Sequence, residues 1–304
     1  MMPRIRKREP SKKRFYASFY QGFDLAGMER PLKIGERINT QGSRRMKNML
    51  LEEDYDGIVE LGKTQQKQGA KMLDVCSVLT ERQTEARDSV ILTKRLAESV
   101  HVPLMIDSTD PDVVDEALSN YPGTAFINSV NLEDGGIKAG RVYALAREHG
   151  AFVVNLLIDE KGMAKTVERK LEIAEKLFVI ATSEYGLEPH RLIFDMLTFT
   201  LGTGEEEYAS SAVDTCRAIK DFKKNHPDVF TVLGVSNVSF GLGKQARGVL
   251  NMVFLHHAVK AGLDMTIVNP AEYLEYGNIP RGERRLAEDL VLNKRSDALA
   301  RYVE

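Results

Sequence analysis

The strongest constraint on the fold is an alternation that runs through most of the chain. Short apolar runs rich in Val, Ile and Leu are followed by longer stretches with helical periodicity. Eight runs have the length and composition of strands: 32–36, 72–76, 104–107, 125–129, 152–157, 192–195, 231–237 and 265–269. Helices are predicted at 55–68, 86–99, 111–119, 138–149, 167–185, 206–224 and 245–261. This order, within about 250 residues, favours an α/β fold of the (β/α)₈ type over an open doubly wound sheet.

The same pattern divides the chain into three parts. Residues 1–30 form a basic N-terminal arm and lead-in, residues 31–275 form the barrel, and residues 276–304 form a charged, helix-prone stretch. We interpret this last stretch as a helical connector, although 284–299 fits the last barrel helix equally well.

Charge and cysteine content exclude several classes of protein. Residues 1–14 hold seven basic residues and one acid, which leaves 35 basic and 43 acidic residues in the rest of the chain. We interpret the arm as a solvated terminus, because no motif supports nucleic-acid binding and the body is acidic. No apolar run reaches the roughly 20 residues of a membrane span, and no secretory leader is visible, so we expect a cytoplasmic protein without membrane contact. Two cysteines and six histidines without an HExxH pattern predict no metal site.

A carboxylate or an amide closes each predicted strand. In chain order these residues are Glu36, Asp74, Asp107, Asn128, Asn155, Asp195, Asn237 and Asn269. In a (β/α)₈ barrel the carboxyl ends of all strands meet on one face, where active sites occur, so we expect the eight side chains to surround one mouth. Each residue alone is explained equally well as a loop residue or a helix cap; the complete set points to a site.

The residue types at the strand ends limit the ligand. Carboxylates and amides with few cations suit a flat polar heterocycle with alternating donors and acceptors, such as an aminopyrimidinone edge. A phosphate site is the rival interpretation, because SNVSFGLGKQ (236–245) supplies glycines after the seventh strand.

Several segments at these positions carry a family resemblance. They are IGERINTQGSRR (34–45), GAKMLDV (69–75), VPLMIDST (102–109), INSV (127–130), LIFD (192–195), FTLGTGEEE (199–207) and GVSNVSFG (234–241). In this order the chain resembles the pterin-binding methyltransferase family over about residues 31–275. Within that family it is most similar to the folate domain of cobalamin-dependent methionine synthases and to methyltetrahydrofolate:corrinoid methyltransferases.

The resemblance implies a pterin-binding TIM barrel that transfers a methyl group from methyltetrahydrofolate to cob(I)alamin, or to another corrinoid carried by a partner domain or protein. Carried over by motif, Asp107, Asn128 and Asp195 would bind the pterin ring, and Asn237 would approach the methyl-bearing nitrogen. The other implied folate-binding residues are Glu36, Asn39, Gly42, Ser43, Arg44, Asp74, Lys244 and Arg247. Free-standing relatives imply a homodimer, whereas a domain fused to corrinoid modules would be monomeric.

Three departures from the family pattern keep alternatives open. Cys76 stands where Asn is common, Met196 where Pro is usual, and Gly243 where methionine synthases tend to have Arg. We interpret Cys76 as a small residue that fills the pocket, because no histidine or second cysteine lies nearby in sequence. A dihydropteroate-synthase-like enzyme would need a basic pyrophosphate site and a lysine near the sixth or seventh strand, and neither is evident in LIFDMLTF or VLGVSNVSF. A non-catalytic folate-binding module is the remaining alternative.

Overall fold

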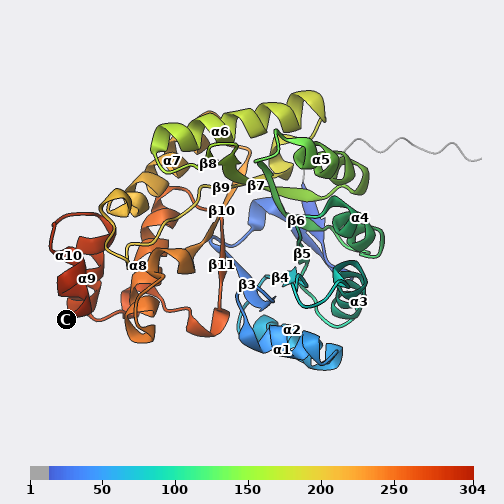
Figure 1. Ribbon diagram of the computed structural model, residues 1–304, viewed down its shortest axis with the longest axis horizontal. Coiled ribbons are helices and arrows are strands. Elements are labelled where there is room, and N and C mark those ends of the chain that lie inside the picture. Colours follow the sequence, from blue (N-terminus) through green and yellow to red (C-terminus); the bar gives the residue numbers. More distant parts are fainter. Residues whose placement is uncertain (1–13) are drawn as a thin grey trace, which may run out of the picture.

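Eight parallel strands close into a barrel in the computed structural model, which describes residues 14–304 (Figure 1). The strands are β3 (Leu32–Asn39), β4 (Met72–Cys76), β5 (Leu104–Asp107), β6 (Phe126–Leu132), β7 (Phe152–Asp159), β9 (Leu192–Asp195), β10 (Phe230–Gly234) and β11 (Met265–Val268). Each pairs with the next, and β11 pairs with β3 to close the ring. A short strand, β8 (Gly162–Met163), adds antiparallel to β7. The predicted (β/α)₈ barrel is confirmed.

A ring of helices surrounds the strands (Figure 1). The helices are α1 (Arg44–Leu51), α2 (Tyr55–Lys67), α3 (Glu85–Ala97), α4 (Pro111–Ser119), α5 (Ile137–His149), α6 (Val167–Val179), α7 (Ser211–Asn225) and α8 (Lys244–Ala261). Each of the first seven barrel strands is followed by a helix, as the sequence predicts. Helix α1 is an addition, and it begins where the Ser43 hydroxyl accepts a hydrogen bond from the Met46 N–H. Within residues 14–304, no helix is long and apolar enough to cross a membrane.

The barrel interior is packed with apolar side chains from alternate strand positions. They include Ile34, Met72, Met105, Phe126, Phe152, Val154, Ile193, Val232 and Met265. The rings of Phe126 and Phe152 stack with their centroids 4.5 Å apart. Because successive side chains in a strand point to opposite faces, the intervening residues face the helices. The interior is therefore a filled core that supports the carboxyl ends of the strands.

A hairpin near the start of the described chain covers the amino-terminal end of the barrel. It consists of β1 (Phe15–Ala17) and β2 (Gly22–Asp24). Tyr16 is buried, stacks on Phe23 at 5.0 Å and meets Phe126 edge-on at 5.7 Å. Residues 1–13, which carry most of the basic arm, lie outside the described residues.

The last segment packs on the helix ring beside α8. It contains α9 (Arg281–Val291) and α10 (Ala298–Val303), which lie on the side of α8 away from the strands (Figure 1). The Tyr276 ring stacks on His256 of α8 at 3.6 Å, and the Tyr302 hydroxyl donates to the Ala246 carbonyl at 2.6 Å. The segment is thus tied to both halves of α8. Its role as a connector remains a prediction.

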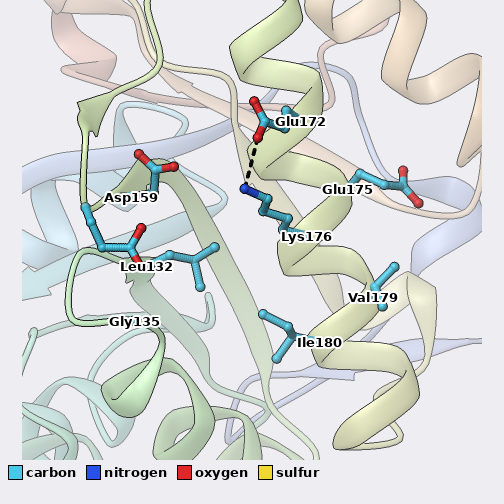
Figure 2. Close-up of a pocket in the computed structure, with 9 residues that line it drawn as sticks. Leu132, Gly135, Asp159, Glu172, Glu175, Lys176, Val179 and Ile180 are labelled. Atoms are coloured by element: carbon cyan, nitrogen blue, oxygen red, sulfur yellow. Dashed lines mark hydrogen bonds and ion pairs between the residues drawn. The ribbon is translucent and has the colours of Figure 1, made fainter.

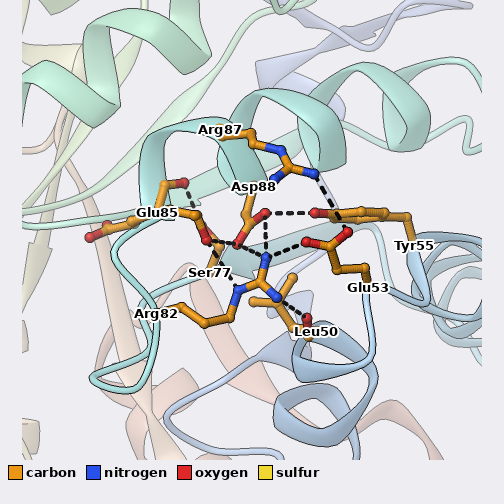
Figure 3. Close-up of polar contacts among 9 residues, drawn as sticks. Leu50, Glu53, Tyr55, Ser77, Arg82, Glu85, Arg87 and Asp88 are labelled. Carbon is orange, nitrogen blue, oxygen red and sulfur yellow. Dashed lines mark hydrogen bonds and ion pairs between the residues drawn. The ribbon is translucent and has the colours of Figure 1, made fainter.

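A buried polar network fixes the loop that follows β4 (Figure 3). Asp88 of α3 accepts hydrogen bonds from the Tyr55 hydroxyl at 2.6 Å and the Thr84 hydroxyl at 2.7 Å. The Arg82 guanidinium pairs with Asp88 at 3.2 Å and donates to the Leu50 carbonyl at 3.1 Å. The loop is therefore anchored to α1, α2 and α3 beside the mouth of the barrel.

Candidate functional site

Five of the predicted site residues share the inward face of the strands at the carboxyl end of the barrel. They are Glu36, Asp74, Asp107, Asn128 and Asp195, and each lies two positions after an apolar residue of the barrel interior. Because side chains two apart in a strand point the same way, these five polar groups lie above the apolar core. This is the face of a (β/α)₈ barrel that carries active sites.

Hydrogen bonds join four polar residues from the consecutive strands β3 to β6. The Asn39 carboxamide nitrogen donates to Asp74 Oδ2 and to Asp107 Oδ2, both at 2.7 Å. The Asn128 nitrogen donates to Asp74 Oδ1 at 3.3 Å, and strand register sets Asn128 beside Asp107. Asn39, which lies at the end of β3, therefore links two carboxylates that would otherwise only repel each other.

Burial makes these carboxylates hard to ionise. It raises the pKa of Asp74 to about 6, although hydrogen bonds from Asn39 and Asn128 act in the opposite direction. Burial, followed by the negative charge of Asp74, raises the pKa of Asp107 well above its ordinary value. Burial also raises the pKa of Glu36, and the charge of Arg37 partly offsets that rise. A donor-rich ligand edge can supply hydrogen bonds that stabilise the ionised forms.

Asp195 supplies a further carboxylate from β9. The Leu197 N–H donates to Asp195 Oδ1 at 2.8 Å, and Oδ2 accepts no hydrogen bond from the described part of the chain. Burial raises the pKa of Asp195 to about 6, against the lowering effects of this hydrogen bond and of the Lys170 charge. One oxygen of this group is thus held by the backbone and the other is available to a ligand.

Asn237 does not end a strand, which corrects the predicted strand 231–237. Strand β10 stops at Gly234, and Val235–Ser239 form a 3₁₀ turn. The Asn237 side chain is exposed and makes no hydrogen bond to residues 14–304. Its nitrogen would lie 3.2 Å from a Cβ at position 234, so the glycine gives this side chain room. The reactive position proposed by motif is therefore on a turn above the strands.

Arg247 of α8 holds that turn. Its Nε donates to the Ser239 hydroxyl at 3.1 Å and its Nη2 donates to the Ser236 carbonyl at 3.3 Å. The Ser239 hydroxyl in turn donates to the Ser236 carbonyl at 3.1 Å. The positive charge of Arg247 also lowers the pKa of Glu36, against the larger effect of burial. Lys244, at the start of α8, is exposed.

The Gly42-Ser43-Arg44 turn lies beside the carboxylates and lines a different space. These three residues, with the 79–81 loop, border a cavity of about 390 Å³. Gln41, which also lines this cavity, donates its N–H to Asn39 Oδ1 at 2.9 Å. The contact of this turn with a folate remains a prediction.

One of the eight strand-end residues, Asn155, does not face the mouth. Asn155 lies within β7, which continues to Asp159, and its side chain points to the helix layer. There it accepts from the Tyr143 hydroxyl at 2.5 Å and donates to the Ile193 carbonyl at 3.0 Å. Asn269 follows β11 and caps the next turn by accepting from the Ala271 N–H at 3.2 Å. The expectation that all eight residues converge is therefore wrong at Asn155.

Cys76 and Lys170 complete the surroundings of the site. Burial, together with the charges of Asp107 and Asp74, raises the pKa of the Cys76 thiol to about 12, so this thiol is not a nucleophilic thiolate near neutral pH. Lys170 of α6 is fully buried and reaches the loop after β9. The sequence of the sixth and seventh strands does not reveal this lysine, because it lies on helix α6. The feature of the sequence that indicates a buried lysine is its position on the same helical face as Ile173, Ala174 and Leu177.

A separate cavity lies outside this site. It has a volume of about 580 Å³ and is bordered by the end of β6, the end of β7 and α6 (Figure 2). None of the predicted site residues lines it, and two of its carboxylates are engaged in ion pairs, Glu172 with Lys176 at 2.9 Å and Asp159 with Arg169 at 2.6 Å. Among residues 14–304, no three His, Cys, Asp or Glu side chains are grouped to hold a metal ion.

Comparison with known proteins identifies the family of the chain. The family model described as "Pterin binding enzyme" matches residues 35–269. The chain is 41 % identical over 294 residues to a methionine synthase of Mycobacterium tuberculosis (strain ATCC 25618 / H37Rv), covering 96 % of this chain and 25 % of that protein. It is 42 % identical over 284 residues to a methionine synthase of Mycobacterium leprae (strain TN), covering 92 % and 24 %. The chain therefore spans about a quarter of the length of these relatives.

Solved structures share the fold at low identity. A dihydropteroate synthase from Stenotrophomonas maltophilia superposes with a TM-score of 0.58 at 18 % identity, covering 80 % of this chain and 89 % of that one. One from Xanthomonas albilineans, crystallised with 4-aminobenzoic acid, gives 0.60 at 16 % identity, covering 86 % and 94 %. These likenesses support the barrel architecture alone.

Proposed function

The chain belongs to the pterin-binding enzyme family, and we propose that it transfers a methyl group from methyltetrahydrofolate to a corrinoid cofactor carried by a partner domain or protein. The observation that carries this proposal is the set of carboxylates and amides at the barrel mouth, beside an exposed Asn237 with no partner in the described chain. The similarity to two methionine synthases over nearly the whole chain supports this reaction over other pterin chemistry.

The pterin edge fits the donors and acceptors of the mouth. A pterin offers an amino group and a ring N–H, which are donors, next to a carbonyl, which is an acceptor. We assign the donors of the ring to the Asp107 and Asp195 carboxylates and its acceptor to the Asn128 amide. Asn39, which also donates to Asp74, would hold Asp107 in place through the hydrogen bond that it already donates to this carboxylate. Glu36 and the Gly42-Ser43-Arg44 turn would lie along the same ligand.

Asn237 is assigned to the methyl-bearing nitrogen. A tertiary amine is a poor leaving group, so this nitrogen must gain a proton or a hydrogen bond as its bond to the methyl breaks. An amide that bonds more strongly as the charge develops stabilises the transition state over the ground state. The corrinoid, when a partner supplies it, accepts the methyl group. Arg247 keeps the Asn237 turn fixed, which reduces reorganisation during the reaction.

The direct test mixes the purified protein with methyltetrahydrofolate and cob(I)alamin and follows methylcobalamin by absorbance. We expect turnover by the native protein and a loss of about 100-fold or more in Asn237→Ala, as for other single transition-state donors. Folate affinity should change far less than turnover in this variant. Gln245→Ala is the matched control, because Gln245 is exposed on the first turn of α8.

Two outcomes would reject the proposal in different ways. Folate binding without methylcobalamin, even when a corrinoid protein is supplied, would identify a non-catalytic folate-binding module. Condensation of a pterin pyrophosphate with aminobenzoate would identify a dihydropteroate synthase. Against that second function, the buried Lys170 amine is engaged by backbone carbonyls and is not presented to the mouth.

A further inference from the structure

The loop that follows Asp195 is held from beneath by a buried lysine. The Lys170 ammonium, on α6, donates to the Met196 carbonyl at 2.5 Å and to the Leu197 carbonyl at 2.9 Å. It also lies 5.3 Å from the centre of the Phe199 ring. Three residues of the 196–199 loop thus contact one side chain from a neighbouring element.

The position of this lysine is costly in an ordinary helix. Lys170 is fully buried and shares its helical face with Ile173, Ala174 and Leu177, all of them fully buried. A buried ammonium is tolerated only where acceptors replace its water. An apolar residue at position 170 would pack on that face and would need no hydrogen-bond acceptors. The charge of Lys170 therefore has a role other than the packing of α6.

A continuous chain of hydrogen bonds connects Lys170 to Asp195. Lys170 donates to the Met196 carbonyl, and the N–H of the same peptide unit, that of Leu197, donates to Asp195 Oδ1 at 2.8 Å. Leu197 has a φ of 53°, a left-handed conformation that is uncommon for leucine. Thr215 of α7 also donates to the Leu197 carbonyl, at 2.7 Å. The two peptide units that flank the Leu197 Cα are therefore held by side chains from α6 and α7.

The charges that face Lys170 come from two elements. They are Asp195 on β9 and Asp214 on α7. Burial lowers the pKa of Lys170 to about 8, and these two negative charges oppose that effect. Asp214 accepts a hydrogen bond from the Ser210 hydroxyl at 2.6 Å. On α6 itself, Arg169 pairs with Asp159 at 2.6 Å. Of the two carboxylates that face Lys170, only Asp195 also accepts a hydrogen bond from Leu197, a residue that Lys170 holds in place.

We propose that Lys170 is a positioning residue of the pterin site, which fixes the 196–199 loop and sets a positive charge behind Asp195 so that this carboxylate is ionised when it meets the ring. This inference rests on the proposed function, since Asp195 is taken as a pterin ligand. The direction of the charge effect agrees with it, because Lys170 lowers the pKa of Asp195 against the effect of burial.

The test compares the pH dependence of methyltetrahydrofolate affinity in the native protein, Lys170→Gln and Thr215→Val. Glutamine keeps a hydrogen-bond donor and removes the charge, whereas Thr215→Val removes a neutral donor to the same carbonyl. We expect Lys170→Gln to move the acid limb of the affinity profile upward by about one pH unit, and Thr215→Val to leave it in place. Equal displacement in both variants, or none in either, would overturn the inference. If the native protein binds no methyltetrahydrofolate, the proposed function itself fails.

A second measurement does not depend on folding of the Lys170 variant. Coupling between two charges is reciprocal, so the near-isosteric Asp195→Asn change should lower the pKa of Lys170. The ¹³Cε resonance of Lys170, followed by NMR against pH in the native protein and in Asp195→Asn, reports this pKa. A fall of about one unit supports the inference, and an unchanged Lys170 pKa would reject it even if Lys170→Gln does not fold.

Discussion

The carboxamide nitrogen of Asn39 lies 2.7 Å from the carboxylate of Asp107, although β4 separates their strands. The same nitrogen lies 2.7 Å from Asp74, on the strand between them. One amide therefore donates to two buried carboxylates. This contact reduces the repulsion between Asp74 and Asp107, which would otherwise favour their protonated forms. The arrangement makes Asn39 a test of the whole carboxylate cluster.

Asn39→Ala should weaken methyltetrahydrofolate binding by about 10- to 100-fold, since a hydrogen bond to a charged group contributes about 1.5–3 kcal/mol. The loss should grow as the pH falls, because Asp74 and Asp107 would take up protons more readily. Isothermal titration calorimetry across pH measures both effects. Asn120→Ala, a surface amide at the end of α4, serves as the control. An affinity in Asn39→Ala equal to that of the control would show that the cluster does not bind the ligand.

Asp195→Asn should stabilise the protein above neutral pH. The pKa of Asp195 is raised from 3.8 to about 6, so the folded state holds this proton more tightly than the unfolded state. The stability from this group is fully present below about pH 4 and is lost as the pH rises through about 6. This pKa already includes the attraction to Lys170, so we expect a gain of about 1–3 kcal/mol at pH 7.5 and almost none at pH 4. Urea unfolding at both pH values would detect this, and a variant destabilised at pH 7.5 would contradict it.

Arg247→Ala should reduce turnover more than folate affinity. Arg247 holds both Ser236 and Ser239, and releasing them would let Asn237 leave its position. A loss of about tenfold or more in kcat is expected, because small displacements of a transition-state donor are costly. Steady-state kinetics and binding titrations would separate the two effects, with Gln245→Ala as the control. A loss in affinity as large as the loss in kcat would assign Arg247 to ligand binding instead.

Tyr16→Ala should destabilise the barrel from its amino-terminal end. Tyr16 is buried against Phe23, Phe126 and Phe152, and truncating a buried aromatic side chain costs about 3–5 kcal/mol. The neighbouring Phe15 is half exposed, so Phe15→Ala should cost far less. Urea unfolding would compare the two variants. Equal stabilities would mean that the hairpin does not close the barrel in solution.

Most of the fold could be predicted because the strands of a parallel barrel are buried on both faces and stand out as continuous apolar runs. The N-terminal hairpin and α1 were missed. The hairpin is two strands of three residues each, and α1 is only eight residues long with two arginines at its start. Elements this short leave too little periodicity to separate them from loops.

The candidate site was predictable where a strand ends on an inward-facing residue. Asp107 and Asp195 close their strands in this way. The prediction for Asn155 is wrong because β7 continues four residues past it. Asn155 directly follows the inward-facing Val154, so its side chain points toward the helices. The role of Lys170 could not be predicted from the sequence, because only tertiary packing brings α6 beneath the loop after β9.

The hairpin and the filled interior leave the described barrel with one way in for a small molecule, at the carboxyl ends of the strands. Under the proposed function, the partner that carries the corrinoid must approach that same opening. Occupancy by the folate would then have to precede partner docking, and the spent folate could depart only after the partner withdraws. The aromatic side chains that close the amino-terminal end of the barrel would in this way impose a compulsory order of binding and release.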